Sequence, residues 1–212
     1  MISNIRTLPS EAAPSLVPSH SAPTPRETLD HALIEGIAGG DRSATQVLYA
    51  RYHARIYRFA LRFLHDQAAA EDVVNEVFLD VWCKARSFRG RSQVATWLYA
   101  LTRHKAIDLL RHRSPNVLDG EPRESIDETT DHPDTALLKK QHGSILLGCL
   151  SRLTLAHREI IDLVYYHEKT IEEVAAIIGV PRNTVKTRMF YARRHLAELL
   201  AAQGIVTAEA TR

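Results

Sequence analysis

Apolar residues recur every three or four positions from Leu29 to Arg113, a stretch that contains no proline. This spacing is typical of consecutive amphipathic helices. We expect four helices, over residues 27–38, 41–64, 68–85 and 94–113. Asp41 is a suitable N-cap for the second helix, and the Gly39-Gly40 pair separates it from the first. The pattern therefore predicts a first domain of four helices around one core.

The pattern changes in residues 114–136, which contain three prolines and seven acidic residues against one arginine. Self-repulsion in a segment of this composition predicts an extended acidic linker. Helical spacing returns near Thr135, continues to about Leu153 and resumes from Ala156 to His167. The sequence therefore predicts a second, smaller helical domain over residues 137–203, and an all-α fold of two small helical domains.

Both ends of the chain differ from these domains. Five of the nine prolines lie in the first 25 residues among Ser, Thr and Ala, which predicts a disordered tail over residues 1–26. Residues 204–212 are predicted to form a C-terminal tail. No stretch approaches the roughly 18 apolar residues of a membrane span, and the N-terminus lacks the apolar core of a signal peptide. We expect a cytoplasmic protein without stable membrane insertion.

The composition gives little support to an enzyme. The 212 residues are 45% hydrophobic and 25% charged with a net charge of +2, as in ordinary globular proteins. Cys83 and Cys149 match no metal-ligand spacing, and we expect both to be buried. The chain contains no GxGxxG, GxxxxGK[ST], GxSxG or HExxH motif, although it has eleven histidines. We therefore expect neither catalysis nor a cofactor nor a metal site.

The strongest motif begins at Thr170, which has the spacing of a capping box with Glu173. Gly179 would supply a turn and Val185 would anchor the next helix, as in a helix-turn-helix. The residues expected on the exposed first turns, where base edges and phosphates are recognised, are Arg182, Asn183, Thr184, Lys186, Thr187 and Arg188. The alternative is a helical hairpin with a merely solvated charged face. Five basic and no acidic residues from Arg182 to Arg194 favour nucleic acid.

A second basic patch lies between Trp82 and Arg113, a segment that contains eight Lys and Arg residues and a single acidic residue, Asp108. Four aromatic residues interrupt it, a combination suited to unpaired DNA. One stripe of the predicted helix, with Trp97 beside it, consists of Thr96, Ala100, Arg103, His104, Ile107 and Arg111. For Trp97 and Tyr99 the alternative is plain core packing.

The third helix has an acidic face. The residues expected in the core are Val73, Val74, Val77, Phe78, Val81 and Trp82. The opposite half contains Asp72, Asn75, Glu76, Leu79 and Asp80. An exposed leucine among carboxylates could bind a basic protein partner, although a single exposed leucine is also common.

Together these blocks resemble a known family. Over residues 28–202 the segments EDVVNEVFLDVW, TWLYALTRHKAIDLLR and LTLAHREIIDLVYYHEKTIEEVAAIIGVPRNTVKTRMFYARRHL, with the acidic linker between the last two, resemble bacterial extracytoplasmic-function (ECF) sigma factors. The resemblance implies a non-catalytic subunit that binds core RNA polymerase and directs promoter-specific transcription initiation. It also implies an anti-sigma protein as a partner. Residues 27–113 would be region 2, which melts the −10 element, and residues 137–203 would be region 4, which recognises the −35 element.

The resemblance assigns roles residue by residue. Core polymerase would bind Asp72, Asn75, Glu76 and Leu79. The −10 element of promoter DNA would be contacted by Arg89, Arg91, Ser92, Gln93, Trp97, Arg103, His104 and Arg111. The six residues of the second helix of the helix-turn-helix would contact the −35 element. The chain departs from the usual family residues at Asn75, His104 and Pro181, where Gln, Asn and Ser are usual.

Two other functions compete with this interpretation. A stand-alone helix-turn-helix regulator would bind duplex DNA without polymerase and would use its first domain as a sensor or dimeriser. A metal hydrolase would use the histidines. The basic patch with aromatics in the first domain distinguishes the sigma factor from the regulator, which has no use for unpaired DNA.

Overall fold

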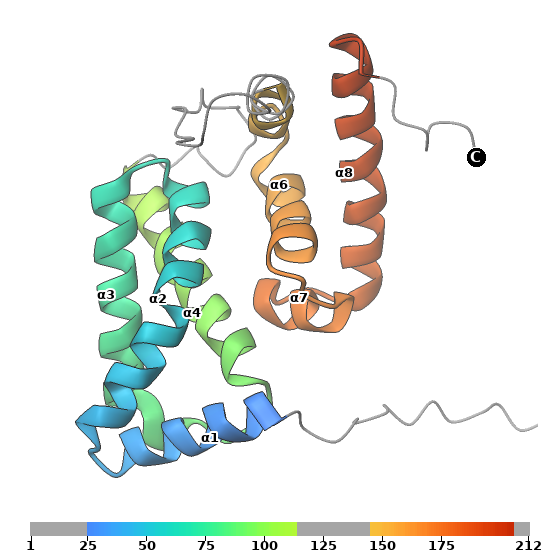
Figure 1. Ribbon diagram of the computed structural model, residues 1–212. Helices are drawn as coiled ribbons and strands as arrows, with labels where there is room; N and C mark the ends of the chain where they lie inside the picture. Colours follow the sequence, from blue (N-terminus) through green and yellow to red (C-terminus); the bar gives the residue numbers. More distant parts are fainter. Residues whose placement is uncertain (1–24, 114–144, 206–212) are drawn as a thin grey trace, which may run out of the picture.

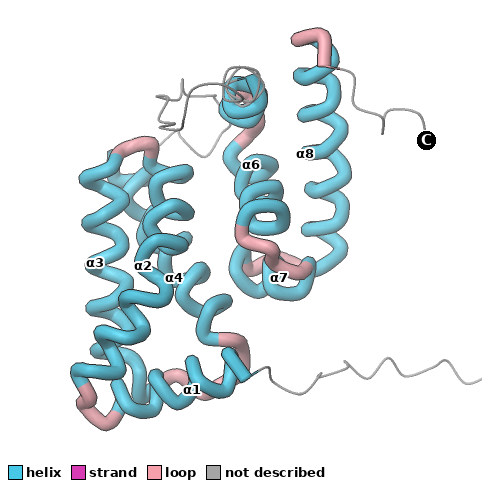
Figure 2. Tube along the Cα trace, in the orientation of Figure 1, coloured by secondary structure: helices cyan, strands magenta, loops and turns pink. Residues whose placement is uncertain are grey.

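The computed structural model describes residues 25–113 and 145–205, and within these ranges it contains helices and loops but no strand (Figures 1 and 2). The predicted all-α fold is confirmed. The predicted acidic linker lies outside the described residues, as do residues 1–24 and 206–212 of the predicted tails. Pro25 and Arg26, which the predicted tail included, instead belong to the first helix, where proline is tolerated in the opening turn.

The first domain contains α1 (Pro25–Ala38), α2 (Arg42–Leu64), α3 (Gln67–Lys84), a short 3₁₀ turn η1 (Ala85–Ser87) and α4 (Val94–Arg113). The second contains a helical stretch over residues 145–151, α6 (Leu155–Ile161), a π-helical turn η3 (Asp162–Tyr166), α7 (Ile171–Ile178) and α8 (Arg182–Ala202). The long helix predicted over 156–167 is therefore two pieces, because the hydrogen-bond pattern widens at Asp162.

Local side chains set the starts of α2 and α3. The Asp41 carboxylate accepts from the backbone N–H of Ser43 at 2.8 Å, which confirms the predicted N-cap. Asp66 accepts from the N–H of Ala69 at 3.1 Å at the start of α3. These hydrogen bonds satisfy amides that have no partner inside the helix. They also hold the pKa of each carboxyl below its usual value, through the Ser43 hydroxyl and amide for Asp41 and mainly through the Ala69 amide for Asp66.

In the first domain α2, α3 and α4 pack side by side, and α1 crosses one end of them (Figure 1). The fully buried side chains of its core include Leu48, Tyr52, Ile56, Phe59, Val74, Val77, Val81 and Leu98. Burial of each large side chain stabilises the fold by roughly 1.5–3 kcal/mol. Buried Asp30 of α1 accepts hydrogen bonds from the Tyr52 hydroxyl and from Arg51, so α1 is fastened to α2 by a satisfied polar group.

Two predictions about α3 were wrong. Trp82 was expected in the core but is 39% exposed, and Cys83 was expected to be buried but is exposed. The buried arc of α3 ends at Val81, and Trp82 instead borders an open groove with Tyr49 and Arg42 of α2. The indole lies at the open side of this groove and keeps contact with solvent.

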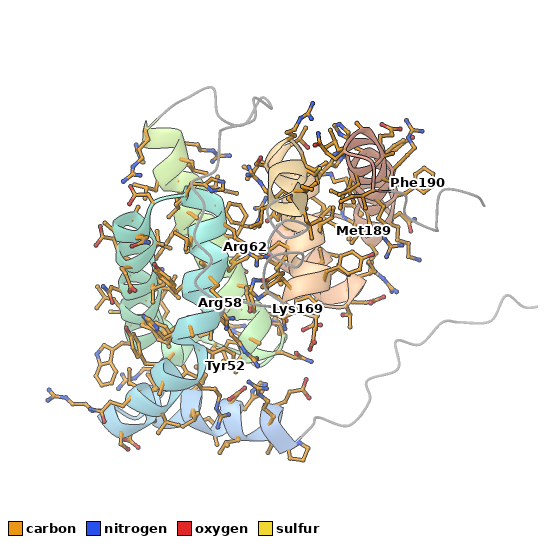
Figure 3. The ribbon with its side chains drawn as sticks, turned by 45° about the horizontal axis from the view of Figure 1, so that its top comes forward. Tyr52, Arg58, Arg62, Lys169, Met189 and Phe190 are labelled. Carbon is orange, nitrogen blue, oxygen red and sulfur yellow. The ribbon has the colours of Figure 1, made fainter. Side chains whose placement is uncertain are left out.

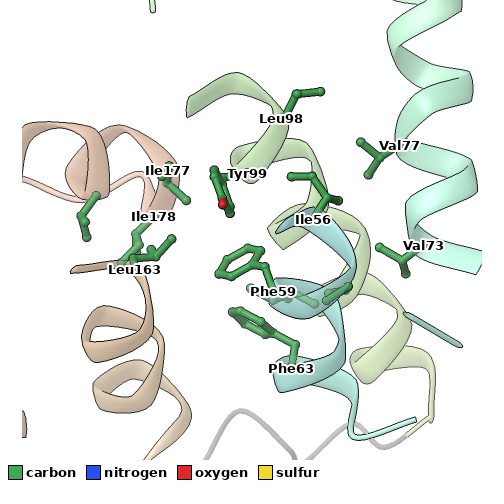
Figure 4. Close-up of a cluster of buried hydrophobic side chains, with 14 of the residues drawn as sticks. Ile56, Phe59, Phe63, Val73, Val77, Leu98, Tyr99, Leu163, Ile177 and Ile178 are labelled. Carbon is green, nitrogen blue, oxygen red and sulfur yellow. The ribbon is translucent and has the colours of Figure 1, made fainter. Parts of the chain in front are cut away.

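The two domains share a continuous apolar core. Phe59 and Tyr99 of the first domain belong to the same buried cluster as Leu163, Ile177 and Ile178 of the second (Figure 4). Helices α4 and α7 are in direct contact along this seam. The periodicity of the sequence predicted the two helical sets but not this packing between them. No helix in residues 25–113 or 145–205 is long and apolar enough to cross a bilayer.

Candidate nucleic-acid interface

The helix-turn-helix predicted at Thr170 is present. The Thr170 hydroxyl accepts from the N–H of Glu173 at 3.2 Å, and the Glu173 carboxylate accepts from the N–H of Thr170 at 2.9 Å, which completes the capping box. Gly179 ends α7 with a φ of 75°, a left-handed conformation that glycine adopts without strain. Val185 is fully buried and anchors α8 as predicted. Helix α8 thereby presents its first turns to solvent.

The exposure of the six predicted α8 residues follows from this anchoring. Arg182, Asn183, Lys186 and Thr187 are exposed, whereas Thr184 and Arg188 are half-buried. Arg182 forms an ion pair with Glu172 of α7, so it is partly neutralised within the protein. The residue before the helix, Pro181, is the N-cap and provides no side-chain cap.

Two exposed aromatic residues of α8 were missed by the sequence analysis. Phe190 is 63% exposed and lies one turn after Lys186, and exposed Tyr191 lies one turn after Thr187. Residues four apart share a helix face, so the same spacing that placed Lys186 could have found both. Figure 3 shows Phe190 on the outer side of α8, whereas Met189 beside it is buried.

The acidic face of α3 is exposed as predicted. Asp72, Asn75 and Glu76 are exposed, and Leu79 is 62% exposed beside them. This face is tied to α4, because the Lys105 Nζ lies 3.1 Å from a Glu76 oxygen and 3.2 Å from an Asp80 oxygen. Burial opposes the charged form of Lys105, but the two carboxylates outweigh it and raise the pKa of Lys105.

The loop before α4 turns its basic residues outward. Arg89, Arg91 and Gln93 are exposed, and Ser92 is half-buried. Phe88 packs the loop against α1 and α4, because the centre of its ring lies 4.9 Å from that of half-buried Trp97 and 5.4 Å from that of His31. Trp97 is thus partly packed and partly accessible, which lies between the two alternatives of contact with unpaired DNA and plain core packing.

The predicted stripe of α4 divides into an open and a covered half. His104 and Arg111 are exposed, and the His104 Nδ1 lies 2.7 Å from an Asp108 oxygen. Nearer the start of the helix, Thr96 is buried and Ala100 and Arg103 are half-buried, and Ile107, farther along, is also buried. Tyr99 is 2% exposed, so for this residue the core-packing alternative is confirmed.

Residues of the second domain cover that half. Arg103 donates to the Glu159 carboxylate of α6, and the Thr96 hydroxyl lies 3.2 Å from a Glu173 oxygen of α7. The Tyr99 hydroxyl lies 2.9 Å from the His167 Nδ1. The structure therefore brings the first half of the stripe against the second domain and leaves His104 and Arg111 exposed.

Burial changes the electrostatics of this seam. It raises the pKa of the Glu159 carboxyl, against the opposing effect of Arg103. Burial and then the nearby Arg62 lower the pKa of His167 to about 4, so its ring is neutral near pH 7 and can accept from the Tyr99 hydroxyl. Burial also raises the pKa of Tyr99 to about 12, which keeps that hydroxyl protonated.

Comparison with known proteins follows the same division of the chain. Residues 48–115 match the family model for Sigma-70 region 2, and residues 149–198 match the model for Sigma-70, region 4. The ECF RNA polymerase sigma factor SigL of Mycobacterium tuberculosis is 31% identical over 181 residues, which cover 82% of this chain and 98% of SigL. The chain belongs to the ECF RNA polymerase sigma factors.

Other relatives agree with this assignment. The sigma-H factor of Pseudomonas aeruginosa is 28% identical over 81% of this chain and 93% of its own length. Among solved structures, the sigma factor RpoE of Bartonella quintana, in complex with the anti-sigma factor NepR, superposes with a TM-score of 0.57 at 27% identity, over 74% of this chain and 96% of that one. CnrH in complex with the cytosolic domain of CnrY shares the fold, with a TM-score of 0.61 at 24% identity over 82% and 98%.

As an ECF sigma factor, the protein binds core RNA polymerase and directs promoter-specific initiation at −10 and −35 elements. The family acts in initiation without catalysis of its own. The stand-alone regulator is not favoured, because region 2 and region 4 are both present and in the order that sigma factors require.

The capping box yields a prediction about the sigma factor's region 4. Thr170→Ala removes the acceptor for the Glu173 amide, and we expect it to lower the free energy of unfolding by about 1 kcal/mol. Urea unfolding followed by circular dichroism measures this loss. Thr187→Ala is the matched control, because Thr187 is exposed within α8 and alanine favours a helix interior. Equal stability of the two variants would show that the box contributes nothing.

Proposed function

We propose that three separate surfaces of this sigma factor perform docking, promoter melting and duplex recognition. The single observation that supports this division best is the contrast in charge between the exposed face of α3 and the exposed first turns of α8. An acidic surface repels DNA phosphates and suits a basic protein, whereas a basic helix end suits DNA. In this proposal residues 27–113 are region 2, residues 137–203 are region 4 and residues 114–136 join them.

Docking is assigned to the face formed by Asp72, Asn75, Glu76 and Leu79. Exposure of all four residues supports it, and Leu79 offers an apolar contact at the centre of a polar ring. Lys105 already pairs with Glu76, so a basic polymerase surface would compete with an internal cation for that carboxylate. We therefore assign the larger share of the charge attraction to Asp72, which is exposed.

Contact with the −10 element is assigned to the loop before α4 and to α4 itself. The residues involved are Arg89, Arg91, Ser92, Gln93, Trp97, Arg103, His104 and Arg111. The exposed loop arginines suit phosphates, and the Phe88–Trp97 pair offers an aromatic platform for a base that has left the stack. His104 and Arg111 continue the same helix with exposed side chains.

Contact with the −35 element is assigned to Arg182, Asn183, Thr184, Lys186, Thr187 and Arg188. The buried Val185 holds their helix so that its first turns face outward, which is the geometry of a recognition helix in the major groove. Half-buried Arg188 would contact the backbone at the edge of the groove rather than its floor.

The proposal extends to the setting in which the protein works. We propose that it acts in the cytoplasm with core polymerase, that it has no enzymatic activity of its own, and that an anti-sigma protein restrains it. The solved complex of RpoE with the anti-sigma factor NepR supports the last point, because that sigma factor is similar to this chain across both domains.

Run-off transcription with purified core polymerase on fragments of the host genome tests the proposed function. We expect new start sites that require this protein, preceded by one shared pair of −10 and −35 sequences. An unchanged set of transcripts, with the protein folded by circular dichroism, would contradict the sigma function.

Leu79→Arg tests the docking face. The substitution places a cation where a basic partner is expected, so we predict weaker binding to core polymerase in a pull-down titration and an unchanged circular dichroism spectrum. Leu29→Arg is the matched control, because Leu29 is also an exposed leucine but lies on α1. Equal binding by both variants would remove Leu79 from the interface.

Lys186→Ala tests duplex recognition. If Lys186 binds a phosphate, holoenzyme affinity for duplex promoter should fall, and the slope of log affinity against log salt should decrease by about one unit. Arg42→Ala serves as control, since Arg42 is exposed at the start of α2. A contact with a base would instead relax sequence preference at one position. An unaltered slope and unaltered preference would exclude Lys186 from the interface.

A further inference from the structure

Helix α1 touches the loop of residues 88–93, here called the −10 loop because the proposed function assigns it to the −10 element. The family model for region 2 begins at residue 48, so α1 precedes the matched segment. Even so, α1 packs against η1 and against α4, which are the elements at the two ends of the −10 loop. In Figure 1, α1 lies across the end of the domain where α4 begins. Helix α1 is therefore placed to influence the loop.

The imidazole of His31 is the centre of this contact. Its ring centre lies 5.4 Å from that of Phe88, and the centre of the Phe88 ring lies 4.9 Å from that of Trp97. The three rings therefore form a row that runs from α1 through the −10 loop to α4. All three side chains are half-buried. Aromatic rings at these separations attract one another and restrict each other's orientation.

The backbone of the −10 loop approaches the same imidazole at Gly90. This residue has a φ of 64°, a left-handed conformation that glycine adopts without strain. A β-carbon added at Gly90 would lie 3.3 Å from the Cε1 atom of His31 and 3.6 Å from its Nδ1 atom. His31 thus contacts the loop at two points, the Phe88 ring and the Gly90 backbone.

Helix α1 is itself fixed at both ends of this contact. Asp30, the residue before His31, is 3% exposed and accepts hydrogen bonds from two side chains of α2. At the end of α1, the Arg86 Nε of η1 donates to the Ala38 carbonyl at 3.0 Å. Buried polar groups with satisfied hydrogen bonds make a structure more rigid and specify one arrangement. The position of His31 is therefore set by α2 and η1, independently of the loop that it supports.

We propose that His31 is a positioning residue for the −10 loop, whose ring holds Phe88 against Trp97 and supports the loop at Gly90 in the conformation that receives an unpaired base. This inference rests on the proposed −10 role of the loop and deepens it by adding α1 to that site. A loop that is ordered before DNA arrives does not have to lose conformational entropy during binding. Loss of the ring should weaken capture of the unpaired strand and leave duplex recognition by α8 unchanged.

The accessibility of Trp97 tests the positioning contact in the free protein. The chain has two tryptophans, so Trp82→Phe leaves Trp97 as the only one. In that background we expect His31→Ala to raise acrylamide quenching of the fluorescence, because Phe88 is released from the indole. Leu29→Ala is the matched control, since exposed Leu29 lies two positions away and thus on the opposite side of α1.

A second variant guards against loss of the helix. His31→Gln removes the ring but keeps a side chain that favours a helix, and circular dichroism shows whether α1 and the domain remain folded. We expect the same rise in quenching as in His31→Ala, with a helical signal equal to that of Leu29→Ala.

The effect on DNA is measured with the holoenzyme on a promoter recovered by run-off transcription. One probe is the single non-template strand of its −10 element, and the other is the full duplex at a temperature that keeps it closed. If the fraction of molecules with an ordered loop falls from nearly all to about one in ten, His31→Ala lowers affinity for the single strand about tenfold. Affinity for the closed duplex should not change, and Leu29→Ala should alter neither.

Two results would overturn this inference. The first is equal quenching of Trp97 in His31→Ala and Leu29→Ala. The second is unchanged strand affinity in His31→Ala under conditions where Phe88→Ala weakens strand binding. The Phe88 variant also separates the inference from the proposed function, because normal strand binding by Phe88→Ala would reject the −10 role of the loop itself.

Discussion

Burying the Glu159 carboxylate requires a cation, and Arg103 of the other domain provides it. The arrangement of the two domains depends on this pairing, because an unpaired carboxylate at this depth would cost several kcal/mol. The pair does not act alone, since Asp162 and Arg62 repeat the same chemistry one turn along the seam. Around these charges the apolar side chains of Phe59, Tyr99 and Leu163 exclude water. Charge pairing decides which faces meet, and apolar contact holds them together.

The DNA-binding elements themselves are built locally. The capping box starts α7, Gly179 turns the chain, and Val185 fixes the rotation of α8 about its axis. None of these three features involves a residue of the first domain, so the exposure of the proposed recognition face is set within region 4 itself. Glu173 takes part both in the local structure of α7 and in the contact between domains. One of its carboxylate oxygens completes the capping box, and the other accepts hydrogen bonds from Lys169 and from Thr96 of the first domain.

Sequence patterns predicted the features that depend on residues within a single helix or turn. The N-cap Asp41, the capping box, the exposure of Leu79 and the burial of Val185 all follow from residue spacing and local hydrogen bonding. Trp82 was misplaced because a helical wheel identifies the apolar side of a helix but not where its covering neighbours end. The π-helical turn left no trace in the periodicity of residues 156–167.

The packing between domains was beyond prediction for a different reason. Arg103 fits a DNA phosphate as well as it fits a carboxylate, so its sequence context does not reveal which of them it meets in the free protein. Glu159 lies within an amphipathic stretch where a charged residue is ordinarily solvated. Only the three-dimensional arrangement shows that these two residues, 56 positions apart, neutralise each other.

One measurement tests the coupling of the domains most directly. Both tryptophans, Trp82 and Trp97, lie in the first domain, so tryptophan fluorescence in urea follows the unfolding of that domain, whereas Glu159 lies in the second. We expect Glu159→Ala to lower the fluorescence midpoint, and a double-mutant cycle with Arg103→Met to give a coupling of about 0.5–3 kcal/mol. A midpoint that Glu159→Ala leaves unmoved, with zero coupling, would contradict the account.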